Sequence, residues 1–436
     1  MPSGHRPGAA AAYNINKLQF VPTFYWVDEG PLKPPPGFDP TCKYSTLGSY
    51  YCFNRFNATH VKHWCYSRDG TCPPVNATQI ASFVKHVGAC MKYAASKGLG
   101  IAVNARVDDG LSLGGWRNTL VFDPLQRYGN YSYLEAILYP LADAVRLAMD
   151  NSTHVDFEMQ GEMGATAFFY PRQWITAADR VRQHILAGRP ASWRELVRIG
   201  LGMNNNKLCG CINIGIVDAR EYLGNFSAAF SAVKSDFDTK GIHDLFRSVD
   251  FVGLSAYVPM TTPWFDVCDL EGLMERFDEE MGYYNITLRE LSDQGVQIHW
   301  TEFGLGGGCS NNGDCMATTA EQAAYHPFWG VWGEYRCDRD PWQLCYPNQP
   351  SPVRDYSRYY YNHTAAYLEQ GGCDYYVSAV YVWNLGSWDV QAIYPGSSSG
   401  EGSFRDPVIA GIINSHNARA GIKPHATEVA KASDGI

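Results

Sequence analysis

Two kinds of hydrophobic spacing alternate along the chain. In the stretch 99–107 hydrophobic residues occupy one parity, while Asn104 and Arg106 occupy the other. Between Thr78 and Gly98 the hydrophobic residues instead recur every third or fourth position. The first pattern predicts a strand with one face against helices and one face toward a polar interior, and the second predicts an amphipathic helix before it.

The same alternation repeats along most of the chain, and strand followed by helix predicts a parallel sheet. About eight such units would close into a (β/α)8 TIM barrel, here with long disulfide-bearing loop insertions. Only seven strands are apparent, so the first strand is expected either in the N-terminal segment or upstream of it. The predicted strands lie at 18–26, 99–107, 154–162, 196–203, 249–257, 295–302 and 377–384, with further helices near 131–149, 173–187, 219–239, 270–293 and 352–370.

The length of 436 residues suits one barrel domain. We expect an N-terminal segment over 1–16, the catalytic barrel over 17–418 and a loose tail over 419–436. Hydrophobic residues make up 45% of the chain and charged residues 18%, which is enough for a large core and little sign of disorder. Residues 1–12 lack the apolar core of a signal peptide, so this start is expected to be a processed one.

The charge balance excludes some classes of partner. The formal net charge is −9 and no basic cluster is present, which argues against nucleic acid and anionic membranes. No run of about 20 apolar residues is present to span a membrane. We therefore expect a monomer that acts on a small or polymeric neutral ligand.

Cysteines and glycosylation motifs point to the secretory route. The chain has 13 cysteines, and the odd number leaves at least one unpaired within the chain. Cys309 with Cys315, and Cys337 with Cys345, are plausible short loops, and "LCGC" at 208–211 indicates disulfide chemistry more than a metal site. A secreted, N-glycosylated protein is predicted by seven Asn-X-Ser/Thr motifs, at Asn57, Asn76, Asn130, Asn151, Asn225, Asn285 and Asn362.

Two carboxylates follow predicted strands at the end where TIM barrels place their active sites. Glu162 ends "FEMQGEMG" and Glu302 ends "IHWTEFG". A pair of carboxylates on opposite sides of a cleft is what glycosidic cleavage requires, without metal or cofactor. The alternative is that each glutamate pairs with an arginine as a structural ion pair. Glu158 shares the parity of Glu162 and is expected to be a buried, hydrogen-bonded partner and not a catalyst.

Several polar and aromatic residues at other strand ends are candidates for holding a sugar. Tyr257 could donate its hydroxyl to the Glu302 carboxylate, and Trp383 could place an indole at the floor of the site for stacking. The remaining candidates for substrate contacts are Asn104, Arg106, Asn206 and Trp26. Asp108, on the strand of Asn104 and Arg106, and Asn204, near Asn206, are further candidate hydrogen-bond partners for sugar hydroxyls.

Six motifs occur in an order that resembles clan A glycoside hydrolases: "VPTFYWVDEG", "GIAVNARVDDG", "QGEMG", "VDFVGLSAYVP", "HWTEFG" and "YVWNLGSWD". The segments "DFVGLSAYVP" and "TEFG" look most like glycoside hydrolase family 113, the endo-β-1,4-mannanases, with family 5 more distant. The resemblance implies that Glu162 is the acid/base, Glu302 the nucleophile, Tyr257 its neighbour and Trp383 the −1 subsite platform. Most of the clan has Asn before the acid/base, where this chain has Gly161.

The sequence thus predicts a secreted retaining β-glycosidase, with a mannan-type polysaccharide or oligosaccharide as the favoured substrate. Its two carboxyl groups should then lie about 5 to 5.5 Å apart. Two other functions stay open. One is a cell-wall glycoprotein that binds glycans without cutting them, and the other is a transglycosylase that uses the same residues.

Overall fold

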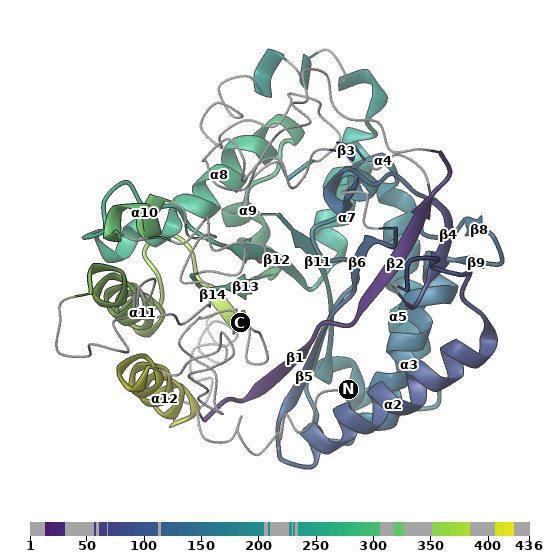
Figure 1. Cartoon of the computed structure of the whole chain (residues 1–436), viewed down its shortest axis with the longest axis horizontal. Coiled ribbons are helices and arrows are strands. Elements are labelled where there is room, and N and C mark those ends of the chain that lie inside the picture. Colours follow the sequence, from purple (N-terminus) through teal and green to yellow (C-terminus); the bar gives the residue numbers. More distant parts are fainter. Residues whose placement is uncertain are drawn as a thin grey trace, which may run out of the picture.

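The computed structural model has a seven-stranded parallel sheet at its centre, surrounded by helices (Figure 1). Every strand predicted from the sequence is found in it, in the order β1-β5-β10-β11-β12-β13-β14. The structure describes residues 14–30, 56–57, 61–67, 69–111, 115–204, 208–209, 226–228, 230–231, 234–305, 317, 319–325, 327, 351–383 and 406–422. The strands span Lys17–Phe20, Gly100–Asn104, Val155–Glu158, Val197–Met203, Phe251–Ala256, Gln297–Phe303 and Val377–Val382.

The sheet curves into a barrel that is nearly closed, with β1 and β14 as its two ends. Asp156 on β10 links these ends through the interior. Its Oδ2 accepts a hydrogen bond from Tyr381 of β14 at 2.6 Å and also contacts the Lys17 ammonium of β1. Two strands at opposite ends of the sheet therefore share one buried carboxylate, which confirms the TIM-barrel-like α/β class.

The chain continues beyond two barrel strands into a second, smaller sheet. β1 is followed by β2 (Thr23–Asp28), and β5 is followed by β6 (Arg106–Asp109), which pairs with β2 in parallel. β4 (Val61–Cys65) pairs with β2 from the other side and runs antiparallel to it. Within the described residues, the strand beside β2 on this side is therefore the antiparallel β4. A first parallel strand was expected there.

The helices pack around the outside of the sheet. α2 begins after Asn76, which forms a capping box with Gln79, so the helix begins before the expected Thr78. The predicted helix near 270–293 is divided in two, because Asn285 adopts a left-handed backbone conformation with φ 57°. The helices are α2 Ala77–Ala95, α3 Tyr139–Ala148, α4 Gly164–Phe169, α5 Pro171–Leu186, α7 Thr239–Ser248, α8 Gly272–Met281, α9 Leu288–Asp293, α10 Ala320–Tyr325, α11 Pro352–Gln370 and α12 Pro407–Ile422.

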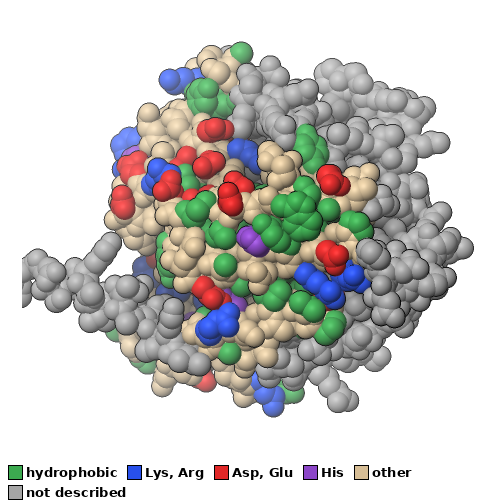
Figure 2. Space-filling view, turned by 90° about the vertical axis from the view of Figure 1, so that its left-hand side faces the viewer, with side chains coloured by type: hydrophobic (Ala, Val, Ile, Leu, Met, Phe, Trp, Pro, Cys, Tyr) green, Lys and Arg blue, Asp and Glu red, His purple; other side chains and the backbone are tan. Residues whose placement is uncertain are grey.

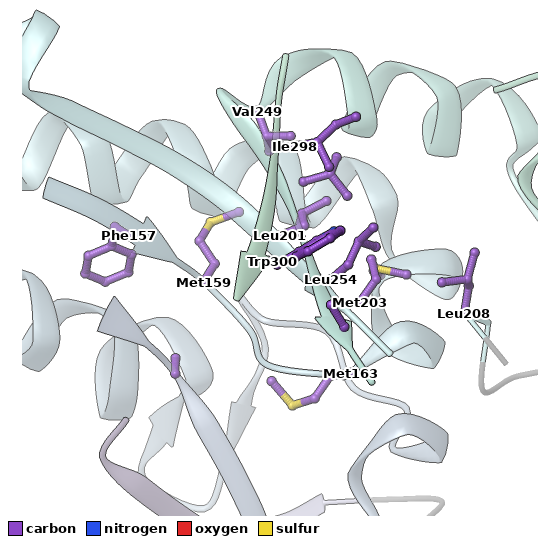
Figure 3. Packing of buried hydrophobic residues seen from close by; sticks show 14 of the residues in the cluster. Phe157, Met159, Met163, Leu201, Met203, Leu208, Val249, Leu254, Ile298 and Trp300 are labelled. Atoms are coloured by element: carbon purple, nitrogen blue, oxygen red, sulfur yellow. The ribbon is translucent and has the colours of Figure 1, made fainter. Parts of the chain in front are cut away.

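The main hydrophobic core lies between the strands and the helices. Leu201, Leu254, Ile298 and Trp300 gather on one side of neighbouring strands (Figure 3), and all four are buried. Most inward positions of the same strands are small or polar, as at Gly202, with Phe251 as an exception that stacks on His299. The barrel interior is therefore unusually polar for this fold, in which bulky aliphatic residues normally fill the centre.

Two disulfides lie within the described residues, Cys65–Cys72 and Cys268–Cys373. Cys209 is also disulfide-bonded, as expected for "LCGC", and Cys90 is a free, exposed thiol. Two short pairings were suggested from the sequence, Cys309 with Cys315 and Cys337 with Cys345. All four of these cysteines lie outside the described residues.

The surface carries charges of both signs. On the side that bears α10, α11 and α12, acidic and basic side chains are interspersed, with hydrophobic side chains and histidine near the centre (Figure 2). Among the described helices, none is long and apolar enough to cross a membrane.

Candidate active site

Glu162 follows β10 at the C-terminal edge of the barrel, in a backbone conformation that is rare for a residue with a side chain. Its φ is 58°, in the left-handed region. Such strain is of order 1–3 kcal/mol and persists where the surroundings fix the conformation, often at functional sites. Both carboxylate oxygens have partners: Asn204 donates to Oε1 at 2.9 Å, and the Arg117 guanidinium lies 3.2 Å from Oε2.

Glu302 is turned into the same region by an irregularity in β13. Leu254 of β12 pairs with Trp300, but the next residue, Ser255, pairs with Glu302, so Thr301 is an extra residue. Without this bulge Glu302 would share the orientation of Trp300, which packs outward against Tyr367. Bulges of this kind re-aim side chains beside active sites.

A chain of alternating charges joins the two glutamates. Nη1 of Arg106 lies 3.7 Å from Oε1 of Glu302, and Nε of Arg106 lies 3.6 Å from Oδ1 of Asp108. The same Asp108 oxygen accepts a hydrogen bond from Arg117 at 2.7 Å, and Arg117 contacts Glu162. Three carboxylates and two guanidinium groups therefore form one continuous cluster, and the side chains of both glutamates are more than nine-tenths buried.

Tyr257 contacts Glu302 as the sequence suggested, and Trp383 contacts Arg106. The hydroxyl of Tyr257, which follows β12, donates to Oε2 of Glu302 at 3.2 Å. Trp383, which follows β14, is half-buried, and the Arg106 guanidinium lies 5.3 Å from its ring centroid. Arg106 therefore contacts both the carboxylate and the predicted stacking platform.

Glu158 lies one layer deeper in the barrel and is buried, as predicted. Asn104 donates to its Oε1 at 2.8 Å. Burial first, and then the charges of Glu302 and Glu162, raise the pKa of Glu158 well above its ordinary value. Burial and the neighbouring carboxylates therefore favour the protonated form of Glu158.

The structure corrects two expectations for substrate contacts. Trp26 is fully buried and packs within the main hydrophobic core, so it has no exposed surface with which to contact a sugar. Asn104 is 2% exposed and supports Glu158, and its amide fills the space beside Gly161: a Cβ on that glycine would lie 2.3 Å from Oδ1 of Asn104. Asn206 lies outside the described residues.

Arg117 was not among the residues selected from the sequence, and Asp108 was expected only as a hydrogen-bond partner for sugar hydroxyls. Asp108 is on the same parity of its strand as Arg106, and this was the available signal for it. Arg117 follows the short strand β7 (Gly115–Trp116), in a segment without a recognisable period. Its role depends on tertiary contacts alone.

The pair holds a proton to higher pH than isolated glutamates would. Burial, followed by the charge of Glu162, raises the pKa of Glu302 from its ordinary 4.5 to about 7, although Arg106, Arg117 and the Tyr257 hydroxyl oppose the shift. Because the second carboxylate is a cause of the shift, the proton belongs to the pair and not to one member. Two such groups can share one proton and act as one acid and one carboxylate near neutral pH.

Within the part of the chain that the structure describes, no group of three His, Cys, Asp or Glu side chains is arranged to hold a metal ion. The carboxylates and guanidinium groups of the cluster are polar groups that can donate and accept hydrogen bonds.

Comparison with known proteins gives similarity of fold. No family model matches the chain, and no curated protein matches it. Solved structures similar to this chain include β-mannanases and a β-glucuronidase. One is a GH113 β-1,4-mannanase in a complex, with a TM-score of 0.45 and 10% identity over 95% of this chain and 93% of that chain.

Two further structures show the spread of these similarities. A GH113 β-mannanase from Alicyclobacillus acidocaldarius, in complex with ManMIm, has a TM-score of 0.37 and 14% identity over 77% of this chain and 78% of that chain. A β-glucuronidase from Ruminococcus gnavus has a TM-score of 0.34 and 10% identity over 79% of this chain and 47% of that chain. Similarity at this level concerns the fold and assigns neither activity nor substrate to the chain.

Proposed function

We propose that the protein is a retaining β-glycosidase in which Glu302 is the nucleophile and Glu162 the acid/base. The observation that carries the proposal is the pairing of two buried carboxylates from distant strand ends in one charge cluster. A special backbone geometry places each of them there, namely the left-handed conformation of Glu162 and the bulge before Glu302. Residues held in this way are typical of functional sites.

The proposed reaction proceeds in two displacements. In the first, a Glu302 oxygen bonds to the anomeric carbon while the glycosidic bond breaks, and Glu162 gives its proton to the departing oxygen. In the second, Glu162 takes a proton from water, the water oxygen bonds to the anomeric carbon, and Glu302 leaves. Transfer to another sugar hydroxyl in place of water would make the protein a transglycosylase.

Three groups around Glu302 fit these steps, although burial raises the pKa of its carboxyl group. The Tyr257 hydroxyl and the Arg106 guanidinium both stabilise negative charge on Glu302, which the nucleophile must carry. Trp383 beside Arg106 offers an aromatic face for a sugar ring. A β-mannan or a related β-linked wall polysaccharide is the proposed substrate class.

A second function is favoured by one observation: both glutamates are ion-paired with arginines. A protein that binds glycans without cleaving them would also be compatible with such pairs. Incubation with a panel of mannans and β-glucans separates the two functions. New reducing ends support the enzyme, whereas binding without new ends supports the glycan-binding protein.

Azide rescue tests the two roles separately. In Glu302→Ala, azide should restore turnover of an activated substrate and give a glycosyl azide of inverted configuration. In Glu162→Ala, it should give an azide of retained configuration, because the nucleophile is still present. The exposed Glu195 provides the control, since Glu195→Ala should hydrolyse at the normal rate without azide. Undiminished hydrolysis by Glu302→Ala would eliminate its role.

We also propose that the protein is secreted and N-glycosylated. Two disulfides and the paired Cys209 support an oxidising compartment. The five glycosylation-motif asparagines whose side chains are described are all exposed, namely Asn76, Asn130, Asn151, Asn285 and Asn362. Release of N-glycans by an amidase, followed by peptide mass measurement, should show Asn-to-Asp conversion at these sites, and an unmodified set from a secreting eukaryotic host would contradict the proposal.

A further inference from the structure

Asp108 occupies the centre of the charge cluster. Its Oδ1 lies 2.7 Å from Nη1 of Arg117 and 3.6 Å from Nε of Arg106. Each arginine extends to a different glutamate, with Arg117 at Glu162 and Arg106 at Glu302. One carboxylate therefore contacts both of the cations that contact the reacting pair.

The members of the charge cluster come from separate elements of the fold that converge at this point. Asp108 and Arg106 lie two residues apart on β6 and so share one side of that strand. Arg117 comes from the 3-10 turn Arg117–Thr119, and its buried Nε has no hydrogen-bond partner. The Arg117 guanidinium is therefore held mainly by its charged partners, of which Asp108 is the nearer.

We propose that Asp108 is a positioning residue that controls the charge of the Glu162–Glu302 pair through Arg117 and Arg106. The proposal rests on the catalytic roles proposed for the two glutamates and gives Asp108 a role that acts on the pair, in place of the sugar contact expected from the sequence. Asp108 draws both guanidinium groups toward itself and partly neutralises them. The pair can then keep the single proton that the first displacement consumes.

The groups that face Glu302 decide the sign of the effect. Burial and the charge of Glu162 raise its pKa, and Arg106, Arg117 and Tyr257 lower it. Glu158 also faces Glu302, and the charge of Glu302 is one of the causes that raise the pKa of Glu158. If Asp108 loses its charge, the arginines act on the two glutamates without compensation, so the pKa of Glu302 should fall from about 7. A change of one charge at this range moves such a value by about one pH unit.

The test is a ¹³C-carboxyl NMR titration of the full chain labelled at glutamate. Glu302→Gln identifies the Glu302 signal by its loss. Asp108→Asn should lower the Glu302 midpoint by about one pH unit, and Asp108→Glu, which keeps the charge, should restore it. Asp355→Asn serves as the control for loss of an exposed aspartate charge and should leave the midpoint unchanged.

A second variant should shift the Glu302 midpoint in the opposite direction, which a general loss of folding would not do. Arg117→Gln removes a positive charge beside the pair, so the midpoint should rise. Circular dichroism checks that each variant is folded. If neither variant moves the midpoint, or if both move it in the same direction, the proposal is overturned.

The titration does not depend on turnover, so it separates this proposal from the proposed function. Shifted midpoints in a protein that cleaves no glycan would keep the role of Asp108 in the charge cluster and refute the glycosidase. Cleavage with an unchanged midpoint in Asp108→Asn would keep the glycosidase and refute the role of Asp108.

Discussion

Replacing Glu302 by Gln should stabilise the folded protein at alkaline pH and have little effect at acidic pH. Burial and the charge of Glu162 raise the pKa of Glu302 from 4.5 to about 7. The folded protein therefore binds this proton more tightly than the unfolded chain does. The associated stability is present below about pH 4.5 and is lost as pH rises through about 7.

The size of the effect follows from the shift. A rise from 4.5 to about 7 corresponds to about 3 kcal/mol in the free energy of unfolding. Glutamine has a similar shape and no charge, so Glu302→Gln avoids this cost. We expect the variant to exceed the wild type by up to about 3 kcal/mol near pH 8.5 and by about zero near pH 4.

Urea unfolding at both pH values, followed by tryptophan fluorescence, measures the difference. Glu195→Gln removes an exposed carboxylate and is the matched control, with an expected change within about 0.5 kcal/mol at both pH values. The contrary result is that the two proteins differ in free energy of unfolding by the same amount near pH 4 and near pH 8.5. In that case the ionised Glu302 carboxylate would not destabilise the folded protein, and the reasoning would be refuted.

Three further predictions concern the same site. Tyr257→Phe removes the hydrogen bond to Glu302 and should lower kcat about tenfold, as a bond to a charged group is worth about 1.5 kcal/mol; steady-state kinetics with an unchanged kcat would contradict this. Gly202→Ala places a Cβ 1.7 Å from Oε1 of Glu158 and 2.6 Å from the Gln160 carbonyl oxygen. Thermal unfolding should therefore show a free energy of unfolding lower by at least about 2 kcal/mol, and a wild-type Tm would argue against this packing. Because the reaction needs one proton on the pair, kcat/KM should fall as pH rises through about 7, and a flat profile from about pH 5 to pH 9 would exclude this proton as the one that reacts.

The barrel could be predicted from the sequence because its strands alternate in polarity. All seven predicted strands are present, and the helix predicted near 352–370 is α11. Much of the predicted helix near 219–239 lies outside the described residues, but residues 226–228 and 230–231 are helical, and the next helix, α7, begins at Thr239. The division between α8 and α9 was also missed, because a left-handed Asn285 depends on a local turn that hydrophobic spacing does not encode.

The candidate site could be predicted only in part, for related reasons. Glu162, Glu302 and Tyr257 were selected because each ends an apolar strand. In the structure Tyr257 donates to Glu302, and Arg117, Asp108 and Arg106 link Glu162 to Glu302. The extra residue in β13 could not be predicted, since a bulge is fixed by pairing with neighbouring strands. Trp26 was misassigned because a strand-end tryptophan has the same sequence pattern whether it lines a cleft or fills the core.

Covalent trapping tests the central claim most directly. An activated 2-deoxy-2-fluoroglycoside, of the sugar that the polysaccharide panel identifies, slows both displacements and should leave a glycosyl-enzyme that survives digestion. Peptide mapping by mass spectrometry should then find the sugar on Glu302. A label on Glu162, or hydrolysis of the polysaccharide with inversion and no labelled peptide, would contradict the account.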